Sequence, residues 1–320
     1  MFLQFLIVKA QTYAPQVGFD GTTAIHKNNT IFIDWANSAT ITRGYKDIAI
    51  PESGYVDYGV ETDAIGVANT NIVSLGDDGE AVITFNHPII NGEGADFAVF
   101  ENGFLEQDGS ELAYLELAFV EVSTDGVEYI RFPAVSENQS ETQIDGFGFM
   151  DARYINNFAG KYIQDYGTPF DLSELIPLTN GTTVDLNNIN YIKLIDVIGT
   201  IDTTYASYDI ENNIVNDPYP SEFSSGGFDL NAVGVIHNSN TNLLENNQFF
   251  RLNIYPNPVN LTLIIESNSV IKKVIIYSLQ GKELISTSTN QIDIYFLDKG
   301  IYFISVETNN EIFKKEFIKN

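Results

Sequence analysis

Three acidic side chains stand inside runs that are otherwise apolar, and they have the clearest chemical potential in the sequence. Glu101 and Asn102 end one such run, Asp196 lies within LIDV, and Asp229 lies within GGFDLNAV. A carboxylate in an apolar strand must be paired, hydrogen-bonded or bound to a metal, because burying an uncompensated charge is costly. Calcium takes roughly six to eight oxygen ligands from carboxylates, amides and carbonyls. We therefore predict that these four residues form one calcium site; the alternative is that they cap turns and accept backbone N–H bonds.

Paired carboxylates could instead hydrolyse a glycosidic bond. That chemistry needs two carboxyl groups facing one sugar cleft. Glu101, Glu116 and Glu121 are candidates by position. Glu116 and Glu121 are an odd number of residues apart on one expected strand, so they should point to opposite faces. Hydrolysis of a polysaccharide is therefore an alternative that the pattern does not favour.

Nucleophilic and thiol chemistry find little support in the sequence. There is no cysteine, which excludes disulfides, thiol catalysis and cysteine zinc sites. The three histidines, His26, His87 and His237, are scattered, and no Gly-x-Ser-x-Gly motif accompanies them. Neither a catalytic triad nor a zinc site is predicted, and the histidines are expected in loops or on the surface.

Aromatic residues are plentiful and could bind a flat ligand by stacking. Trp35, Tyr45, Tyr55, Tyr58 and Tyr219 lie in or near expected loops. Exposed rings beside acids would suit a sugar or another flat molecule. Packing in a hydrophobic core explains the same residues equally well.

The charge of the chain is unevenly distributed. The net charge is -27, yet the part after Tyr255 holds seven basic and seven acidic residues and is neutral, so the acidic excess belongs to the preceding body. Such a field repels phosphate backbones, which argues against nucleic-acid binding. No apolar run reaches the ~20 residues of a membrane-spanning helix.

The first residues resemble part of a signal peptide. An apolar run is followed by Val8-Lys9-Ala10, which is similar to a small-residue cleavage site. We predict a signal segment at residues 1–10, with Gln11 as the first residue of the mature protein. The basic segment that normally opens a signal peptide is missing, so either the start codon is placed too late or the run is a buried first strand.

Short apolar runs separated by turn residues dominate the body and predict strands. These runs lie at residues 30–36, 81–85, 96–100, 114–123, 127–132, 191–199 and 228–236. Two segments, 151–163 and 171–178, could form short helices with an Asp at the start. Many short strands with turns between them predict an all-β protein with a two-sheet antiparallel sandwich.

One stretch, VEVSTDGVEYIRF at residues 120–132, predicts a hairpin from its Asp-Gly turn. It resembles a hairpin of galactose-binding-like jelly rolls. The resemblance extends over about residues 21–238 to a family of Bacteroidetes surface proteins, through GTTAIHKNNTIFIDWA, VSLGDDGEAVITFNHPIINGEGADFAVFENGF, YLELAFVEVSTDGVEYIRFPAVS, AGKYIQDYGTPFDL and GGFDLNAVGVIHN. It implies a secreted jelly-roll-like sandwich, with some members associated with outer-membrane uptake of corrinoids.

After a polar linker at residues 239–251 the strand pattern restarts, predicting about seven short strands in a small Ig-like sandwich at 252–320. The runs IYPNPVN, VIIYSLQGKEL and LDKGIYFISVET and the basic final strand resemble the type A C-terminal sorting domain of the type IX secretion system. The motif residues are Tyr255, Pro256, Asn257, Pro258, Gly281 and Gly300. The resemblance implies the secretion machinery as partner, removal of the tail, and release of the body or its anchoring to surface lipopolysaccharide.

Together these patterns predict a secreted protein on the outer cell surface, with a β-sandwich body at residues 11–238 and a sorting domain at 252–320. The body is expected to be a non-catalytic module that binds a glycan or a small molecule, such as a corrinoid, with calcium. The alternatives are a polysaccharide hydrolase and a structural or adhesive surface protein. A deep cleft with clustered carboxylates would favour the hydrolase, and a shallow aromatic face would favour binding.

Overall fold

The computed structural model describes residues 13–221, 223–240, 252–267, 271–279, 281–308 and 312–320. The predicted signal segment at 1–10, the predicted mature start at Gln11 and most of the predicted linker lie outside the described residues. The chain divides into two compact units, Met1–Thr241 and Asn242–Asn320.

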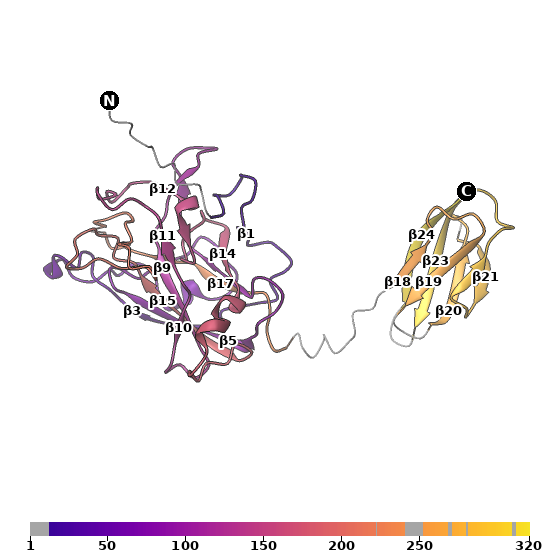
Figure 1. The fold of residues 1–320 in the computed structure, drawn as a ribbon, viewed down its shortest axis with the longest axis horizontal. Helices are drawn as coiled ribbons and strands as arrows, with labels where there is room; N and C mark the ends of the chain where they lie inside the picture. The colour runs from indigo at the N-terminus through magenta and orange to yellow at the C-terminus, as the bar shows by residue number, and fades with distance from the viewer. Residues whose placement is uncertain (1–12, 222, 241–251, 268–270, 280, 309–311) are drawn as a thin grey trace, which may run out of the picture. The chain divides into compact units, whose positions relative to one another are not determined.

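Two five-stranded antiparallel sheets form the frame of the body (Figure 1). The first has the order β1-β14-β6-β17-β2, with strands Ile25–His26, Tyr166–Phe170, Phe97–Phe100, Ala232–Val235 and Asp34–Trp35. The second has the order β10-β9-β15-β5-β3, with strands Ile130–Arg131, Ala118–Ser123, Ile189–Asp196, Glu80–Ile89 and Ser38–Thr42. The all-β prediction is confirmed.

The main core of the body takes side chains from both sheets. Phe97 and Val233 contribute from the first sheet, and Val120, Ile192 and Ile83 contribute from the second. All five are buried. Two sheets that bury facing side chains in one core form a sandwich, as the alternating apolar pattern requires.

Shorter elements close the ends of this sandwich. Three small sheets pair β12 (Met150–Asp151), β8 (Leu112–Tyr114) and β7 (Phe104–Leu105); β11 (Val135–Ser136) and β13 (Ile155–Asn156); and β16 (Asp229–Leu230) and β4 (Val73–Ser74). The 3-10 helices are η1 (Pro51–Ser53), η2 (Glu61–Ala64), η3 (Ala152–Tyr154) and η4 (Leu172–Leu178). These elements carry the loops in which the candidate site lies.

The Asp-Gly hairpin is confirmed. Strands β9 and β10 pair antiparallel, with Ile130 opposite Val122 and Arg131 opposite Glu121. Gly126 adopts a φ of 76°, a conformation that suits the glycine of the predicted turn. The Asp-Gly turn was sufficient to predict this hairpin because both strands lie next to the turn in the sequence.

Other sequence predictions need correction. The expected strand 114–123 is interrupted at residues 115–117, and only residues 34–35 of the run 30–36 are in a strand. The expected helix 151–163 is wrong: after the three residues of η3 the chain forms β13, which pairs with β11. The left-handed φ of 55° at Asn157 is incompatible with a continuing helix. The helix expected at 171–178 is the 3-10 helix η4, with Asp171 accepting a bond from the Ser173 N–H.

The tail has its own two sheets (Figure 1) and its own core. The sheet β18-β19-β22 contains Leu252–Tyr255, Thr262–Ser267 and Gln291–Asp293, and the sheet β21-β20-β23-β24 contains Glu283–Thr287, Ile271–Tyr277, Gly300–Thr308 and Ile312–Lys319. Val274, Ile304 and Phe317 are among its buried core residues. The described part of the tail therefore contains seven strands, as predicted.

Across the described residues, none of the helices has the length and apolar character needed to span a bilayer.

Candidate metal centre and the aromatic surface beside it

Three carboxyl groups from distant segments of the body meet in one place. Glu101 directly follows β6, Glu116 lies in the break between β8 and β9, and Asp229 lies in β16. Their carboxylate oxygens lie within 4.8 Å of one another. The three residues are only 1%, 4% and 4% exposed. No other metal-ligating group of three or more side chains occurs among the described residues at this spacing.

Backbone packing explains how segments so distant in the sequence meet. The Asn231 N–H donates to the Phe100 carbonyl (3.0 Å), which places β16 beside the end of β6. Gly160 packs so closely that a Cβ built on it would lie 1.9 Å from the carbonyl oxygen of Glu116. Only glycine allows the two backbones to come this close. The contact holds residues 115–117, the break that carries Glu116, in place.

Hydrogen bonds orient two of the three carboxyls. The Gly103 N–H donates to Oε2 of Glu101 (2.6 Å), whereas Oε1 is buried and has no hydrogen-bond partner. Asp229 accepts from the Ser74 hydroxyl and, at 3.0 Å, from the Asn102 side-chain amide. Asn102 was predicted as a ligand; as placed, it supports Asp229 through its nitrogen.

The environment opposes ionisation of these groups. Burial raises the pKa of Glu101 and of Glu116 well above the usual range, and the neighbouring Asp229 carboxyl raises both further. Burial also raises the pKa of Asp229 to about 7, although the bonds from Ser74 and Asn102 act in the opposite direction. Carboxyls arranged like this hold protons at neutral pH unless a cation offsets their charge.

Asp196, the fourth predicted ligand, is outside this group of three. Its Oδ1 accepts from the Phe228 N–H (2.6 Å), and its Oδ2 is buried without a hydrogen-bond partner. Burial is the main cause that raises the pKa of Asp196, and the charge of Asp77 raises it further. Glu116 takes the place expected for Asp196. Glu116 also stands in an apolar run, YLELAFV, so the signal that singled out Asp196 could have found it.

The histidines form local contacts. Nδ1 of His237 lies 2.8 Å from Oδ1 of Asp96, a buried carboxyl that also accepts from the N–H groups of Gly92 and Leu172. Asp96 therefore joins three loops around the last body strand. Nδ1 of His26 accepts from a nearby backbone N–H in an exposed turn. These contacts stabilise loops.

A row of aromatic rings lies beside the carboxyl group. Phe104 stacks on Tyr114 (centroids 5.0 Å apart, planes at 15°), and Tyr114 lies 6.5 Å from Phe147, which lies 5.4 Å from Phe223. Phe104, Phe147 and Phe223 are 51%, 64% and 48% exposed. The row lies next to the acids along the chain, because Tyr114 is two residues before Glu116 and Phe104 is three residues after Glu101. We name these four residues the aromatic row.

The aromatic residues expected from the sequence lie elsewhere. Trp35 packs against Phe32 and Phe100 at the edge of the core. Tyr45 and Tyr55 stack on each other with centroids 4.6 Å apart. Sequence analysis missed the aromatic row because its members come from four separate segments, and no local pattern connects them.

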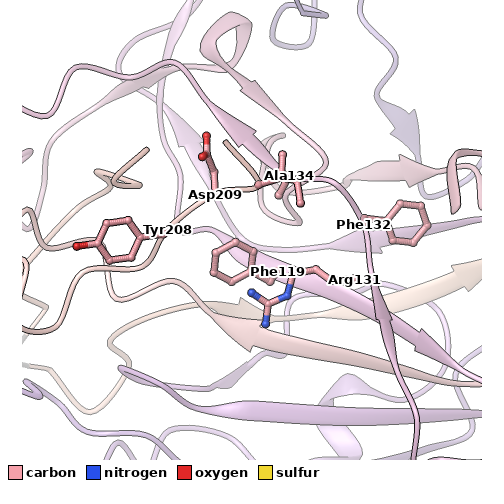
Figure 2. Close-up of a pocket in the computed structure, with 7 residues that line it drawn as sticks. Phe119, Arg131, Phe132, Ala134, Tyr208 and Asp209 are labelled. Carbon is pink, nitrogen blue, oxygen red and sulfur yellow. The ribbon is translucent and has the colours of Figure 1, made fainter. Parts of the chain in front are cut away.

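A separate small pocket lies beneath β9 and β10, with a volume of about 150 Å³ (Figure 2). Figure 2 shows the Arg131 side chain beside the ring of Phe119, and the guanidinium carbon lies 4.3 Å from the ring centroid. Arg131 also pairs with Glu121 at 2.8 Å. Asp209 accepts from the N–H groups of Ser136 and Asn213, which ties the covering loop down. With its charged groups already satisfied, this pocket is a feature of loop packing.

The predicted sorting-motif residues gather at one end of the tail and at two turns. Tyr255 ends β18, and the bonds Tyr255-Pro256 and Asn257-Pro258 are both cis. Oδ1 of Asn257 accepts from the Ile318 N–H (2.9 Å), which joins the motif to the last strand. Gly281 has a φ of 80° in its turn, and Gly300 begins β23.

Comparison with known proteins bears directly on the tail. Residues 253–320 match the family model of a secretion system C-terminal sorting domain. No curated protein matches the chain. Among solved structures, a biofilm-associated protein (its BSP domain) is similar at 9% identity and a TM-score of 0.19, covering 92% of this chain and 53% of that one. The chain thus spans about half the length of that structure, and the likeness is too weak to carry an argument. The sorting domain indicates a secreted, cell-surface protein that engages the type IX secretion machinery.

Proposed function

We propose that the body of this secreted protein is a non-catalytic binding module that holds a glycan against the aromatic row on the outer cell surface. The observation that carries the proposal is the exposure of three phenyl rings in one connected row. Exposed apolar patches on otherwise polar surfaces mark interaction sites. The predicted surface-protein family and the jelly-roll order of the body remain expectations that agree with this proposal.

The form of the surface favours a glycan over a small molecule. Aromatic rings offer broad apolar faces, and the C–H face of a sugar ring can pack on them. An exposed carboxyl stands close by: Asp145 lies two residues before Phe147 and accepts from its N–H at 3.1 Å. Such groups can accept hydrogen bonds from sugar hydroxyls. Sites that enclose a small molecule usually have a volume of roughly 300–1,000 Å³, well above the 150 Å³ of the pocket under β9 and β10.

Burial argues against the alternative of a polysaccharide hydrolase at the three carboxyls. Glu101 and Glu116 lie within 4.8 Å of each other, close to the spacing of about 5 Å in retaining glycosidases. Their exposed fractions of 1% and 4% leave no room for a sugar between them. In this proposal the two carboxyls do not act on the ligand of the row.

The test is binding of the purified protein to immobilised polysaccharides and to a glycan array. The variant carrying Phe104→Ala, Phe147→Ala and Phe223→Ala should lose at least about tenfold in affinity, since stacking on each ring contributes roughly 1 kcal/mol. Tyr55→Ala is the matched control, because Tyr55 is 56% exposed and lies outside the row.

Equal affinity of the triple variant and the wild type would overturn the assignment of the row. If the protein bound a corrinoid and no glycan, the proposal of a glycan ligand would be wrong and a corrinoid would take its place. Binding of neither would favour a structural or adhesive protein and would also overturn the proposal.

The exported body is further proposed to be anchored to surface lipopolysaccharide after the tail is removed, as the sorting-domain resemblance implies. Electrophoresis of the surface fraction should then show a ladder of heavier species that lacks the tail. A single sharp band, released into the medium, would contradict anchoring and leave the binding proposal unaffected.

A further inference from the structure

We infer that Glu101, Glu116 and Asp229 hold a divalent metal ion, with calcium as the chemical class, directly beneath the aromatic row. This inference does not depend on the identity of the ligand at the surface. It concerns a site assembled from three segments that are far apart in the sequence.

The geometry fits one ion. Ca²⁺ binds oxygen ligands at about 2.3–2.6 Å, so two oxygens on opposite sides of the ion lie about 5 Å apart. The oxygens of the three carboxyls lie within 4.8 Å of one another. A single ion can therefore contact all three side chains with little movement of the chain.

An unpartnered oxygen gives independent support. Oε1 of Glu101 is buried without a hydrogen-bond partner, while Oε2 is held by the Gly103 N–H. A buried acceptor left unpaired is costly, and native structures satisfy nearly all such atoms. A metal ion in the carboxyl group would satisfy it.

No basic side chain neutralises the three acids directly. None of the ion pairs among the described residues includes Glu101, Glu116 or Asp229. Arg43 acts on Asp229 from a distance, but its guanidinium donates to the carbonyls of Tyr58, Gly59 and Ser74. Among the described residues, no side chain therefore supplies the positive charge that these carboxyls need when they ionise, and a divalent ion can supply it.

The donor set selects the class of metal. The ligands are carboxylate oxygens, without histidine, and the chain has no cysteine, which suits hard cations. Mg²⁺ usually keeps several water molecules, whereas Ca²⁺ accepts protein oxygens in irregular arrangements. In a site whose three ligands are almost fully buried, Ca²⁺ is the better fit.

The site connects to the surface through two short links. Phe104 lies three residues after Glu101, and Tyr114 lies two residues before Glu116. A bound ion would therefore fix the segments that carry two of the four rings. The ion is a structural fastener in this inference and takes part in no reaction.

The experiment is calorimetric titration of Ca²⁺ into the chelator-treated, intact protein, with thermal unfolding recorded in Ca²⁺ and in chelator. One strong site is expected, and saturating Ca²⁺ should raise the unfolding midpoint of the body by about 5 °C or more. Glu116→Gln and Asp229→Asn should each weaken binding by at least about tenfold, since each removes one charged ligand.

Asp196→Asn is the matched control, because Asp196 is equally buried, also has an unpartnered oxygen, and lies outside the group. It should keep Ca²⁺ binding close to that of the wild type, because Asp196 acts on Glu116 only through its charge and lies outside the group. If a ligand variant does not fold, Glu101→Gln provides the third independent test.

Absence of binding by the folded wild type would overturn the inference. Loss of binding in Asp196→Asn, with binding kept in Glu116→Gln, would also overturn this set of ligands. Because unfolding and calorimetry do not involve a glycan, failure here leaves the proposed binding function standing, and failure of glycan binding leaves the ion site standing.

Discussion

The two units of this protein bury very different side chains. Nine acidic residues are buried among the described residues of the body, against one buried lysine, Lys161. In the described part of the tail, the buried polar side chains are Ser305, Thr308 and Lys319, and no acidic residue is buried. The body combines its apolar core with many buried carboxyls, whereas the described core of the tail is almost entirely apolar.

This difference shows how each unit reaches a single structure. The tail follows a simple rule: alternate residues of seven strands fill one core, and period-2 patterning is enough to specify it. The body uses buried carboxyls such as Asp96 and Asp217 to tie loops to strands, through the N–H groups of Leu172 and Leu117. Its stability should therefore respond to pH and to cations, while that of the tail should not.

The largest expected effect is on export. Removing residues 252–320 should leave a folded body that remains in the periplasm, because the body has its own core and the sorting signal lies in the tail. Cell fractionation and surface proteolysis measure this, with the full chain as the positive control. Arrival of the shortened protein at the cell surface would contradict the division of roles between the units.

A smaller effect is expected from a cavity in the tail. Phe317 is fully buried and stacks on Tyr302, so Phe317→Ala should destabilise the tail by about 3–5 kcal/mol. Differential scanning calorimetry should show a lower midpoint for the tail and an unchanged one for the body. Phe303→Ala is the control, since Phe303 is 40% exposed on β23 and should cost much less. Equal shifts in both transitions would mean that the two units unfold together.

The pH dependence of the body provides a finer test. Burial raises the pKa of Asp77 to about 7, whereas an unfolded Asp titrates near ~3.9. The folded state thus holds the proton more tightly, and Asp77 lowers stability as pH rises from about 4 to about 7. Asp77→Asn should remove this loss, so the stability of the variant relative to the wild type should be higher at pH 8 than at pH 5 by about 3 kcal/mol.

Asparagine keeps an oxygen that can accept from the Ile48 N–H, the bond that Asp77 makes at 2.8 Å. Asp78→Asn is the matched control, because Asp78 is exposed next to it. Denaturant unfolding at several pH values, in chelator, is the measurement. The same pH response in wild type and Asp77→Asn would show that this carboxyl does not create the difference between body and tail.

Much of the architecture could be predicted from the sequence because its causes are local. The alternating runs predicted an all-β chain, and the Asp-Gly turn predicted the β9–β10 hairpin. The motifs around Tyr255 and Gly300 predicted the sorting domain, which the family match at residues 253–320 supports. Turn chemistry, strand periodicity and short motifs act over a few residues, so they can be recognised without a structure.

The composition of the candidate site was decided by tertiary structure. The sequence singled out Glu101 and Asp229, but only the packing of Gly160 against Glu116 and the break at residues 115–117 brought Glu116 to them. Asp196 satisfied the same local criterion and lies outside the group. The physical reason is that an acid in an apolar run signals burial, whereas its neighbours depend on how distant strands and loops pack. The aromatic row is the same case, since four separate segments supply its rings.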